Sequence, residues 1–378
     1  MTNSASPDVL VIGGGVMGAS AAYHAAKAGA RVRLLEQFRI GHTRGSSHGE
    51  SRIIRVAYSE ADYVALARAA YAAWRELEQE AGVPLYYKTG GIDFGAPDAY
   101  ELRTLAATYR ALGIEHEELT AAEIIRRYPQ FRLPEEYVGV MQPEYGMLHA
   151  DRCVAAFAVQ ARRHGAELHE EEPVTAITPL GDGVEVRTAR GVHRAARVII
   201  AAGSWMRPLA AQLGLDLPLT VRKELVMYMA AERPAEFEIG RFPIYIHRLP
   251  GTSSGGAGFP LLGSAHPKFL FHAGGPQVEP EDVDRTPDPA LLARTRAAAL
   301  DVVRGLTGDV VEAIACRYTM TPDEDFLIDR HPEHRQIVLA SPCSGHGFKF
   351  GSIVGKISSD LALRGETAHE IGRFRLRW

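Results

Sequence analysis

The segment from Asp8 to Glu36 constrains the fold of this chain more than any other segment. A short β-branched run, Asp8–Ile12, breaks into Gly13-Gly-Gly-Val-Met-Gly18, which opens an alanine-rich stretch that reads as a helix to Gly29. The alternation in Arg31–Glu36 then indicates a second strand, parallel to the first. This order of strand, glycine turn, helix and strand predicts a parallel sheet covered by helices.

The three glycines of the turn have separate physical roles. Gly13 permits the tight turn, Gly15 lets a diphosphate approach the backbone, and Gly18 lets helix and strand pack closely. The helix N-terminus then presents amide groups and the positive end of its dipole to the anion. Glu36, at the end of the second strand, can accept hydrogen bonds from an adenosine ribose, and its charge disfavours a 2′-phosphate. The segment therefore predicts a site for NAD or FAD and makes NADP the weakest candidate.

Two later segments bear on the choice between NAD and FAD. A buried strand, Val198–Ala201, ends in small residues, as is needed where backbone passes close to a cofactor. Ser344-Gly-His-Gly-Phe-Lys-Phe350 lies between an apolar strand ending at Ala340 and a helix from about Gly351. Such a helix N-terminus stabilises a flavin ring, which gains negative charge on reduction. We therefore expect a flavin at this corner, with an ordinary strand-to-helix turn as the alternative.

Scarce lysines and a close pair of arginines are the candidate substrate-binding groups. Lysine occurs at six positions in a chain that otherwise uses arginine, and Lys349 lies in the glycine-rich corner. Its ammonium suits a substrate carboxylate, and its burial would require a counter-ion. Arg52 and Arg55 place two guanidinium groups three residues apart, so that one could face a flavin and the other a substrate. From the residue pattern alone, solvated surface cations remain the alternative for all three.

Histidine and cysteine patterns predict no metal centre and no disulfide framework. His331-Pro-Glu-His334 has ligand-like spacing, but Pro332 breaks the helix that would align both rings. The three cysteines form no C-x-x-C pair, which fits a reducing cytoplasm. By itself, the isolated Cys316 is expected to be a buried apolar residue.

Charge and hydropathy limit the kinds of partner. Lys and Arg number 42 against 46 Asp and Glu, a formal charge of −4 with no basic block, so neither nucleic acid nor an anionic membrane is expected as a partner. No apolar run reaches the roughly 18 residues of a membrane span, and Met1–Ser6 lacks the basic start of a secretory signal. We therefore expect a cytoplasmic protein with a small-molecule ligand.

The order of strand and helix signals predicts two interleaved domains. A length of 378 residues exceeds a typical domain of about 150 residues. We expect an α/β, Rossmann-like nucleotide-binding domain with a parallel sheet over residues 7–83, 146–219 and 318–378. The remaining segments, 84–145 and 220–317, are expected to form an α+β substrate domain on a mixed, largely antiparallel sheet. Helices are expected over residues 60–81, 99–112, 151–165 and 289–306, with Asp151 as the cap of the third.

Five motifs together resemble those of D-amino-acid-oxidase-type flavoproteins, specifically the group of monomeric sarcosine oxidase and N-methyltryptophan oxidase. The resemblance runs nearly end to end and implies FAD as the cofactor. Its second and fifth motifs are the most specific. The motifs are Gly13-Gly-Gly-Val-Met-Gly18, Gly45-Ser-Ser-His-Gly-Glu-Ser-Arg-Ile-Ile-Arg55, Cys316-Arg-Tyr-Thr319, Asp329-Arg-His-Pro-Glu-His334 and Ser344-Gly-His-Gly-Phe-Lys-Phe350.

The resemblance also implies roles for individual residues. Arg55 and Lys349 match the pair that holds the substrate carboxylate, and Lys268 matches a lysine linked to oxygen activation. Cys316 takes the place of the cysteine joined to the flavin by a thioether, which reverses the apolar expectation. The implied catalytic residues are Lys268, Arg52, His272 and Tyr318, of which the last two also line the substrate pocket. The implied FAD-binding residues are Gly13, Gly15, Val16, Met17, Gly18, Glu36, Ser46, His48, Arg52, Val174, Ala202, Gly203, Trp205, Cys316, Gly345, Gly347, Phe348 and Lys349.

Two positions depart from the family pattern. Ala257 stands where monomeric sarcosine oxidase has a pocket tyrosine, and Cys343 replaces an aromatic residue before the glycine-rich corner. The substitution at position 257 implies a larger or less polar pocket. Substrate identity is therefore the property that the resemblance fixes least.

The implied reaction is oxidation of a secondary amino acid, sarcosine by first preference, to an imine. Hydride passes to the flavin, water hydrolyses the imine to glycine and formaldehyde, and dioxygen is reduced to hydrogen peroxide. Two cations near the amine would lower its pKa and favour the reactive neutral form. The alternatives are N-methyltryptophan, pipecolate, dimethylglycine or a primary amino acid as substrate, a flavin dehydrogenase that does not use dioxygen, a non-catalytic FAD-binding protein, and an NAD-linked dehydrogenase. We expect a monomer.

Overall fold

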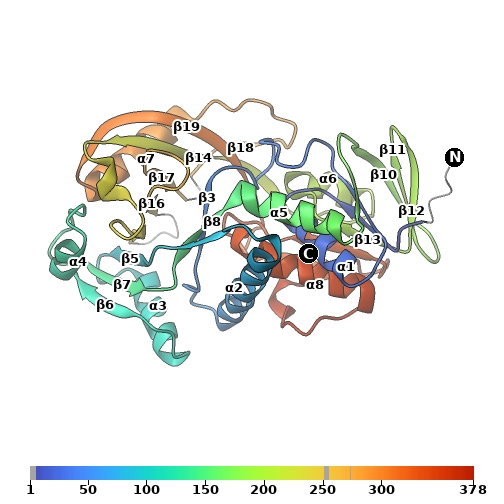
Figure 1. The fold of residues 1–378 in the computed structure, drawn as a ribbon, viewed down its shortest axis with the longest axis horizontal. Coiled ribbons are helices and arrows are strands. Elements are labelled where there is room, and N and C mark those ends of the chain that lie inside the picture. Colours follow the sequence, from blue (N-terminus) through green and yellow to red (C-terminus); the bar gives the residue numbers. More distant parts are fainter. Residues whose placement is uncertain (1–5, 251–254, 273) are drawn as a thin grey trace.

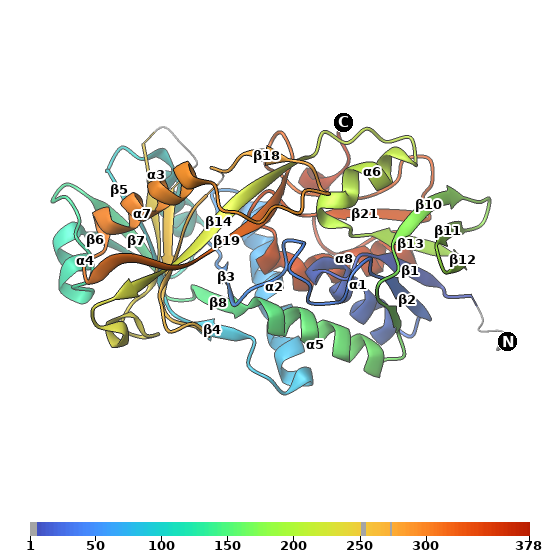
Figure 2. The ribbon, with the colours of Figure 1, turned by 90° about the horizontal axis from the view of Figure 1, so that it is seen from above.

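The computed structural model describes residues 6–250, 255–272 and 274–378. The interpretation of Met1–Ala5 as lacking a secretory signal concerns residues outside this description. Figures 1 and 2 show two regions side by side along the long axis of the molecule, one built around a mostly parallel sheet and the other around a mostly antiparallel sheet.

The mostly parallel sheet holds the glycine turn. Its strand order is β20(Leu327–Arg330), β21(Ile337–Ser341), β13(Arg197–Ile200), β1(Val9–Ile12), β2(Val32–Leu35) and β9(Glu167–His169). Every neighbouring pair is parallel except β20 and β21, which are antiparallel. The β1 strand lies between β13 and β2, so the glycine turn that follows it emerges at the centre of the sheet.

Strand β1 is apolar at every position because both faces of the sheet are covered. Val9 and Val11 pack in the same core as the helices α1(Val16–Lys27) and α8(Gly351–Arg364). Leu10 and Ile12 pack in a second core with α6(Met206–Ala211) and the small antiparallel sheet of β10(Val174–Pro179), β11(Val184–Thr188) and β12(Gly191–Ala195). Burial on both faces explains a continuous apolar run in place of alternation.

Further helices and a small sheet lie between the two regions. Helix α2(Ala61–Ala81) buries Leu66, Ala70 and Trp74 and ends at Gly82, whose φ is 67°. It packs against α8 and α5(Ala150–Arg163). Strands β3(Ser51–Ile54), β8(Gly146–His149) and β4(Tyr86–Lys88) form an antiparallel sheet in that order.

The mostly antiparallel sheet forms one wall of the functional site. Its order is β18(Gln277–Val278), β14(Thr220–Ala231), β17(Lys268–Phe271), β16(Gly256–Phe259), β15(Ile244–Arg248), β5(Gly91–Gly95), β7(Val138–Gln142) and β6(Glu117–Thr120). Long strand β19(Leu306–Met320) also pairs with β14, and β15 pairs with β5 in parallel. Helices α3(Tyr100–Ala111), α4(Ala121–Arg127) and α7(Pro289–Val302) accompany this sheet.

The fold class expected from sequence is confirmed: a Rossmann-like parallel sheet is joined to a mixed, largely antiparallel one. The domain boundaries remain a prediction. Strand β19 runs through the predicted boundary between residues 317 and 318. The β3, β8 and β4 sheet joins residues 86–88 to strands of the other predicted domain.

Two local predictions were wrong. The helix expected over residues 289–306 ends at Val302, because Val303 is extended and Gly305 has a φ of 78°, and Leu306 already begins β19. The cap of α5 is His149 and not Asp151, which lies in the first helical turn and accepts a 2.8 Å hydrogen bond from the Gly49 amide.

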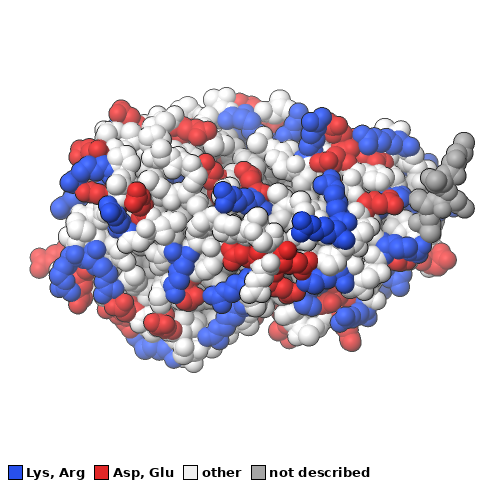
Figure 3. All heavy atoms as spheres, viewed as in Figure 1, with Lys and Arg blue, Asp and Glu red and all other residues white. Residues whose placement is uncertain are grey.

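The surface carries both signs of charge. On the face drawn in Figure 3, lysine and arginine are interspersed with aspartate and glutamate over both regions. Within the described part of the chain, no helix combines the length and the apolar character needed to cross a bilayer.

Candidate active site

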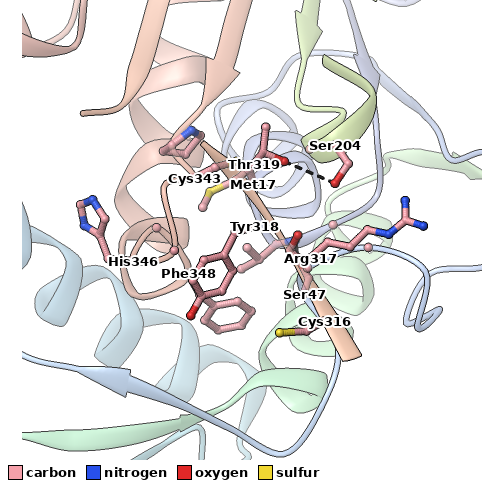
Figure 4. A pocket seen from close by; sticks show the side chains of 18 of the residues that line it. Met17, Ser47, Ser204, Cys316, Arg317, Tyr318, Thr319, Cys343, His346 and Phe348 are labelled. Atoms are coloured by element: carbon pink, nitrogen blue, oxygen red, sulfur yellow. Dashed lines mark hydrogen bonds between the residues drawn. The ribbon is translucent and has the colours of Figure 1, made fainter. Parts of the chain in front are cut away.

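A cavity of about 680 Å³ extends between the two regions. One end lies at the carboxyl ends of the parallel strands, where Ile12, Leu35, Ala201 and Ala340 contribute to its wall. This is the edge at which open α/β sheets bind ligands. The other end is lined by the antiparallel sheet, and Figure 4 shows side chains of β19 and of the glycine-rich corner that face it.

The glycine turn keeps the cavity open where a diphosphate would lie. Gly13 has a φ of 103°, and a Cβ there would lie 2.5 Å from the Ala201 oxygen. A Cβ on Gly18 would lie 1.8 Å from the Gly13 oxygen, so this position tolerates only glycine. Beside the turn, the Val16 amide donates to Ser47 Oγ at 3.1 Å. Backbone shape and amide groups therefore build this end of the cavity.

Glu36 is almost fully buried beside the turn. Its Oε2 accepts a 2.6 Å hydrogen bond from the Gly14 amide, and its Oε1 accepts a 2.8 Å bond from the Phe38 amide. Burial raises the pKa of the Glu36 carboxyl group, and the backbone hydrogen bonds act in the opposite direction. The carboxylate is thus held at the cavity wall, where a ribose hydroxyl could reach it.

Most of the predicted FAD-binding residues line this one cavity, but two do not. Gly18 lies behind the wall and acts through helix packing. The His48 side chain also lies outside the wall, and its Nε2 has no hydrogen-bond partner among the described residues. The residues that do line the cavity are Gly13, Gly15, Val16, Met17, Glu36, Ser46, Arg52, Val174, Ala202, Gly203, Trp205, Cys316, Gly345, Gly347, Phe348 and Lys349.

The glycine-rich corner brings the backbone against two pocket side chains. A Cβ on Gly345 would lie 2.5 Å from the Tyr318 ring and 2.6 Å from the His272 ring. These rings are 5.6 Å apart between centroids at an angle of 50°. Burial is the main cause of the low pKa of His272, about 4, and the charge of Arg248 is the next largest. The imidazole is therefore neutral at physiological pH.

Two cations near Cys316 are held by backbone carbonyl groups. Arg52 donates to the oxygens of Ser46 and His48 at 3.1 and 2.6 Å, and Lys268 donates to the Ser51 oxygen at 2.6 Å. Lys268 is 3% exposed. Burial, and then the charge of Arg52, lower its pKa well below the usual value.

A second pair of cations meets at Tyr58. Lys349, which is 5% exposed, donates to the Tyr58 hydroxyl at 3.0 Å and to the His346 oxygen at 2.6 Å. The Arg55 guanidinium lies over the Tyr58 ring at 4.8 Å from its centroid and donates to the Ala57 oxygen. Burial, and then the charge of Arg55, lower the pKa of Lys349 well below its usual value. The structure therefore brings Arg55 and Lys349 close together.

These four cations share one property. Within the described ranges, none of Arg52, Arg55, Lys268 and Lys349 forms an ion pair with a carboxylate. Backbone carbonyl groups orient them but do not neutralise them. Since a buried charge is costly without a counter-charge, this wall of the cavity is suited to anionic ligands.

Cys316 and Tyr318 lie two positions apart on β19, so their side chains are directed to the same face of the strand. Both line the cavity, and Figure 4 shows the Arg317 side chain extending in another direction. Burial raises the pKa of the Cys316 thiol, while the neighbouring Arg52 acts in the opposite direction. Next on the strand, the hydroxyl groups of Thr319 and Ser204 are hydrogen-bonded at 3.3 Å.

Sequence reasoning missed several residues of the wall. Tyr58 contacts both Arg55 and Lys349, the pair of cations that we call the clamp. Its position three residues after Arg55 could have indicated this role in the sequence. Asp93 and Arg248 form an ion pair at 2.7 Å beside the cavity. A charged residue inside the otherwise apolar Gly91-Ile-Asp-Phe-Gly95 was a usable signal for the first of them.

The His331 and His334 pattern has a structural explanation. His331 Nδ1 accepts hydrogen bonds from the amides of Glu333 and His334, and its Nε2 lies 3.0 Å from the Leu213 oxygen. Both ring nitrogens therefore face backbone groups, and the two rings stack 4.7 Å apart. Among the described residues, no group of three potential ligands is arranged for a metal ion.

The cavity fits FAD on three independent features. The Cβ-intolerant turn and the buried Glu36 suit the diphosphate and the ribose. Arg52 and Lys268, which lack carboxylate partners among the described residues, suit an isoalloxazine ring that becomes negative on reduction. The glycine-rich corner lines the same cavity with Gly345, Gly347 and Phe348, and it leads into η3(Phe348–Phe350) and then α8.

Comparisons with known proteins agree with this fit. The profile of the family described as "FAD dependent oxidoreductase" matches residues 8–361. The chain is 38% identical to the monomeric sarcosine oxidase of Streptomyces avermitilis over 97% of this chain and 96% of that protein. It is 33% identical to the N-methyl-L-tryptophan oxidase of Citrobacter koseri over 98% of each chain. The solved structure of NikD, an unusual amino acid oxidase essential for nikkomycin biosynthesis, aligns with a TM-score of 0.89 at 27% identity and covers 99% of this chain and 98% of that one.

The family match covers far more than half of the chain, and the two relatives exceed 30% identity over nearly its whole length. The predicted resemblance and the predicted class of enzyme are confirmed, which excludes the NAD-linked and non-catalytic alternatives. The chain belongs to the FAD-dependent oxidoreductase family and is an FAD-dependent oxidase of CH–NH donors, similar to the sarcosine oxidases.

Proposed function

We propose that this chain oxidises a secondary N-methyl amino acid, in the first instance sarcosine. The amine becomes an imine, which water hydrolyses to glycine and formaldehyde, and dioxygen is reduced to hydrogen peroxide. The observation that carries this proposal is the pair of Arg55 and Lys349 at Tyr58, for which no carboxylate partner occurs among the described residues. An amino acid carboxylate would supply the missing negative charge.

The two cations would fix the orientation of the substrate. Arg55 offers a planar set of donors, and Lys349 offers a compact ammonium that Tyr58 and the His346 oxygen already direct. A carboxylate bound between them raises the depressed pKa of Lys349 and keeps its charge. Positioning of this kind lowers the barrier by reducing the entropy lost in the reaction step.

The neutral His272 beside Tyr318 would face the amine end of the substrate. Since its pKa is about 4, the imidazole can accept a hydrogen bond from an amine N–H but does not repel the molecule by charge. The cations nearby disfavour an ammonium form, so the reactive neutral amine is favoured.

FAD, when bound, supplies the acceptor for hydride and transfers the electrons to dioxygen. Arg52, Lys268 and the amides of the glycine-rich corner would hold the cofactor and stabilise negative charge on it. The resemblance assigns Lys268 to the activation of dioxygen. Its burial beside Arg52 supports this role, because a small anionic species formed there would meet the charge of Arg52 and would raise the depressed pKa of Lys268, favouring its charged form.

We also propose that FAD is bound covalently through Cys316 Sγ. The thiol lies in the cavity wall, and Arg52 and Lys268 both favour its thiolate form against the effect of burial. Acid precipitation should leave the yellow colour in the wild-type pellet, and Cys316→Ser should release it to the supernatant. Yellow colour in the wild-type supernatant would contradict the linkage and leave the oxidase proposal intact.

A bulkier N-alkyl amino acid is the second candidate substrate. Ala257 lies in the cavity wall opposite Ile246 and Leu270, so a small residue occupies the centre of the substrate-facing sheet. N-methyltryptophan, pipecolate and dimethylglycine stay among the compounds to be compared, as does glycine. An electron acceptor other than dioxygen is the remaining alternative for the second half of the reaction.

The decisive experiment is anaerobic mixing of the purified holoenzyme with a panel of these amines. We expect sarcosine to bleach the oxidised flavin absorbance fastest, and air to restore it with one peroxide per turnover. Bleaching by no amino acid would overturn the proposal, whereas bleaching without peroxide on aeration would indicate a dehydrogenase.

We further infer that the protein acts as a monomer in the cytoplasm, supported by its formal charge of −4 and the mixed charges of the face in Figure 3. Light scattering should give a mass near 41.2 kDa. Twice that mass would contradict the monomer.

A further inference from the structure

We propose that Arg248, held by Asp93, forms a second recognition subsite that binds a carboxylate on the side chain of the substrate. Among N-methyl amino acids that carry a polar side chain, those with an acidic side chain are then preferred over their amides. This inference rests on the proposed oxidation of an N-methyl amino acid and extends it to a substrate class.

The ion pair is built into the sheet. Strand β15 pairs with β5 in parallel, with Ile246 beside Asp93 and Arg248 beside Gly95. Arg248 Nε donates to Asp93 Oδ1 at 2.8 Å, and Arg248 Nη2 forms an ion pair with the same oxygen at 2.7 Å. Asp93 is fully buried, and its Oδ2 accepts a hydrogen bond from the Tyr145 hydroxyl. Both oxygens of Asp93 are thus engaged within the protein, so its role is to fix Arg248.

The guanidinium retains hydrogen-bonding capacity on the cavity side. Arg248 lines the cavity, and its side chain is 17% exposed. Its Nη1 has no partner within the described part of the chain, and a guanidinium has five N–H donors in all. Of the donors left over after Asp93, one N–H of Nη1 and one of Nη2 share an edge of the planar group, which is the arrangement that binds a carboxylate.

The subsite lines the same cavity as Arg55, Lys349 and His272. The His272 amide donates to the Gly255 oxygen at 3.1 Å, and Gly255 precedes β16, the antiparallel neighbour of β15. His272 and the three cations Arg248, Arg55 and Lys349 line this cavity together, and after burial the charges of these cations lower the pKa of His272. A substrate held by its α-carboxylate at Arg55 and Lys349 can therefore direct a side chain toward Arg248.

The part of the cavity wall that is formed by β15, β16 and β17 leaves room for such a side chain. Ile246, Ala257 and Leu270 lie side by side in register on β15, β16 and β17, and all three line the cavity. The small methyl group at position 257 leaves space above the sheet, and the apolar floor offers no competing hydrogen bond. Methylene groups of a substrate side chain can pack there.

The balance of charge favours an acidic ligand over a neutral one. Arg55, Lys349 and Arg248 face the same space, with Asp93 as the carboxylate paired to one of them. Of the other carboxylates that line the cavity, Asp323 and Asp325 pair with Arg377 and Arg373. Glu324 is exposed to solvent, and half-buried Glu60 accepts a hydrogen bond from Ser59. The α-carboxylate of the substrate balances one cation, and a second carboxylate balances the other.

The test compares acids with their matched amides. Substrates are N-methyl-L-aspartate and N-methyl-L-glutamate against N-methyl-L-asparagine and N-methyl-L-glutamine, with kcat/KM measured by peroxide formation. We expect the wild-type enzyme to favour the better acid over its amide by about ten- to hundredfold, the usual value of a charge-assisted hydrogen bond. In Arg248→Met this ratio should fall to near one.

Two further variants separate recognition from a purely structural role. Asp93→Asn removes the paired negative charge, and the ratio of acid to amide should rise, which a loss of sheet stability would not produce. Arg233→Met, an exposed arginine of the same region, should leave the ratio unchanged. A readout independent of turnover is the binding of 2-(methylthio)succinate, a thioether that lacks the amine. This binding is measured from the shift of the flavin absorbance spectrum.

The inference is overturned if wild-type enzyme favours the amides, or if Arg248→Met lowers kcat/KM equally for acid and amide. If Arg248→Met does not retain flavin, the test rests on Asp93→Asn alone. An acid-to-amide ratio of kcat/KM in that variant at or below the wild-type ratio then overturns the inference. Sarcosine distinguishes this failure from that of the proposed function. An enzyme that oxidises sarcosine but shows no acid preference retains its proposed function and loses only the subsite.

Discussion

The two ends of the cavity are built in different ways. The dinucleotide end is built around backbone amides, a Cβ-intolerant turn and the buried carboxylate of Glu36, which all lie within Gly13–Glu36, and residues 201–205 extend its wall. The substrate end consists of charged side chains from distant segments, among them Arg55, Arg248 and Lys349. Shape is therefore the main determinant at one end, and charge at the other.

This difference predicts how each end responds to substitution. At the dinucleotide end, backbone atoms would have to move to admit even one methyl group, so a small change should abolish cofactor binding. At the substrate end, each side chain can be replaced without moving the backbone, so losses should be graded and should fall on substrate binding.

The largest effect is expected for Gly18→Ala. The added Cβ would lie 1.8 Å from the Gly13 oxygen and 2.9 Å from its carbonyl carbon, and neither atom belongs to a flexible side chain. The ratio of flavin to protein absorbance in the purified variant should fall below about one tenth of the wild-type value, since such overpacking costs several kcal/mol. Gly181→Ala is the matched control, because nothing lies within 4 Å of its Cβ. A normal flavin content in Gly18→Ala would refute the view that shape determines this end.

The next largest effect is expected for Lys349→Met. Loss of a charge-assisted hydrogen bond costs about 1.5 to 3 kcal/mol, so kcat/KM for sarcosine should fall about ten- to hundredfold. Arg55→Met should behave similarly, and both variants should keep their flavin. Lys88→Met, which removes an exposed lysine paired with Glu144, serves as the control. A wild-type KM in either variant would remove that residue from the clamp.

Binding should also depend on pH with a defined sign. Burial and Arg55 lower the pKa of Lys349, so its charge is lost as pH rises through this depressed value. The affinity for a carboxylate such as (methylthio)acetate should therefore be full on the acidic side of that pKa and should decrease on the alkaline side. Lys349→Arg should move the decrease to higher pH, because an arginine stays protonated. An affinity that shows no decrease anywhere between the lowest pH at which the protein is folded and pH 10 would contradict this assignment.

The sequence predicts the dinucleotide end better than the substrate end, for a physical reason. Turn, helix and carboxylate follow one another along the chain, so the local pattern of Gly13, Gly15, Gly18 and Glu36 determines their geometry. The residues at the substrate end come together only when strands that are far apart in the sequence form a sheet. Nothing near Arg248 in the sequence indicates that β15 will lie beside β5 and Asp93.

Sequence analysis was also less precise where one local pattern is compatible with two structures. The helix expected over residues 289–306 and the start of β19 share apolar residues near 302–306, and only the conformation of Gly305 separates them. The role of His48 beside a flavin stays a prediction: its side chain lies outside the cavity wall, and its carbonyl group accepts a hydrogen bond from Arg52. A motif identifies a segment more reliably than it identifies which atoms of the segment face the ligand.

The smallest effect is expected for Tyr58→Phe, which tests whether the clamp depends on orientation as well as on charge. The variant keeps the ring over which Arg55 lies and removes only the hydroxyl group that Lys349 Nζ contacts at 3.0 Å and His346 Nδ1 at 3.1 Å. Lys349 then retains its bond to the His346 oxygen, so its charge stays in the cavity but its direction is less fixed. We expect KM for sarcosine to rise about three- to tenfold, the value of one hydrogen bond, with kcat nearly unchanged. Tyr87→Phe, at an exposed hydroxyl bonded to Arg152, is the control. A fall in kcat as large as the rise in KM would instead show that Tyr58 acts in the reaction step, and the division between a shape-determined end and a charge-determined end would have to include a proton-transfer role at the clamp.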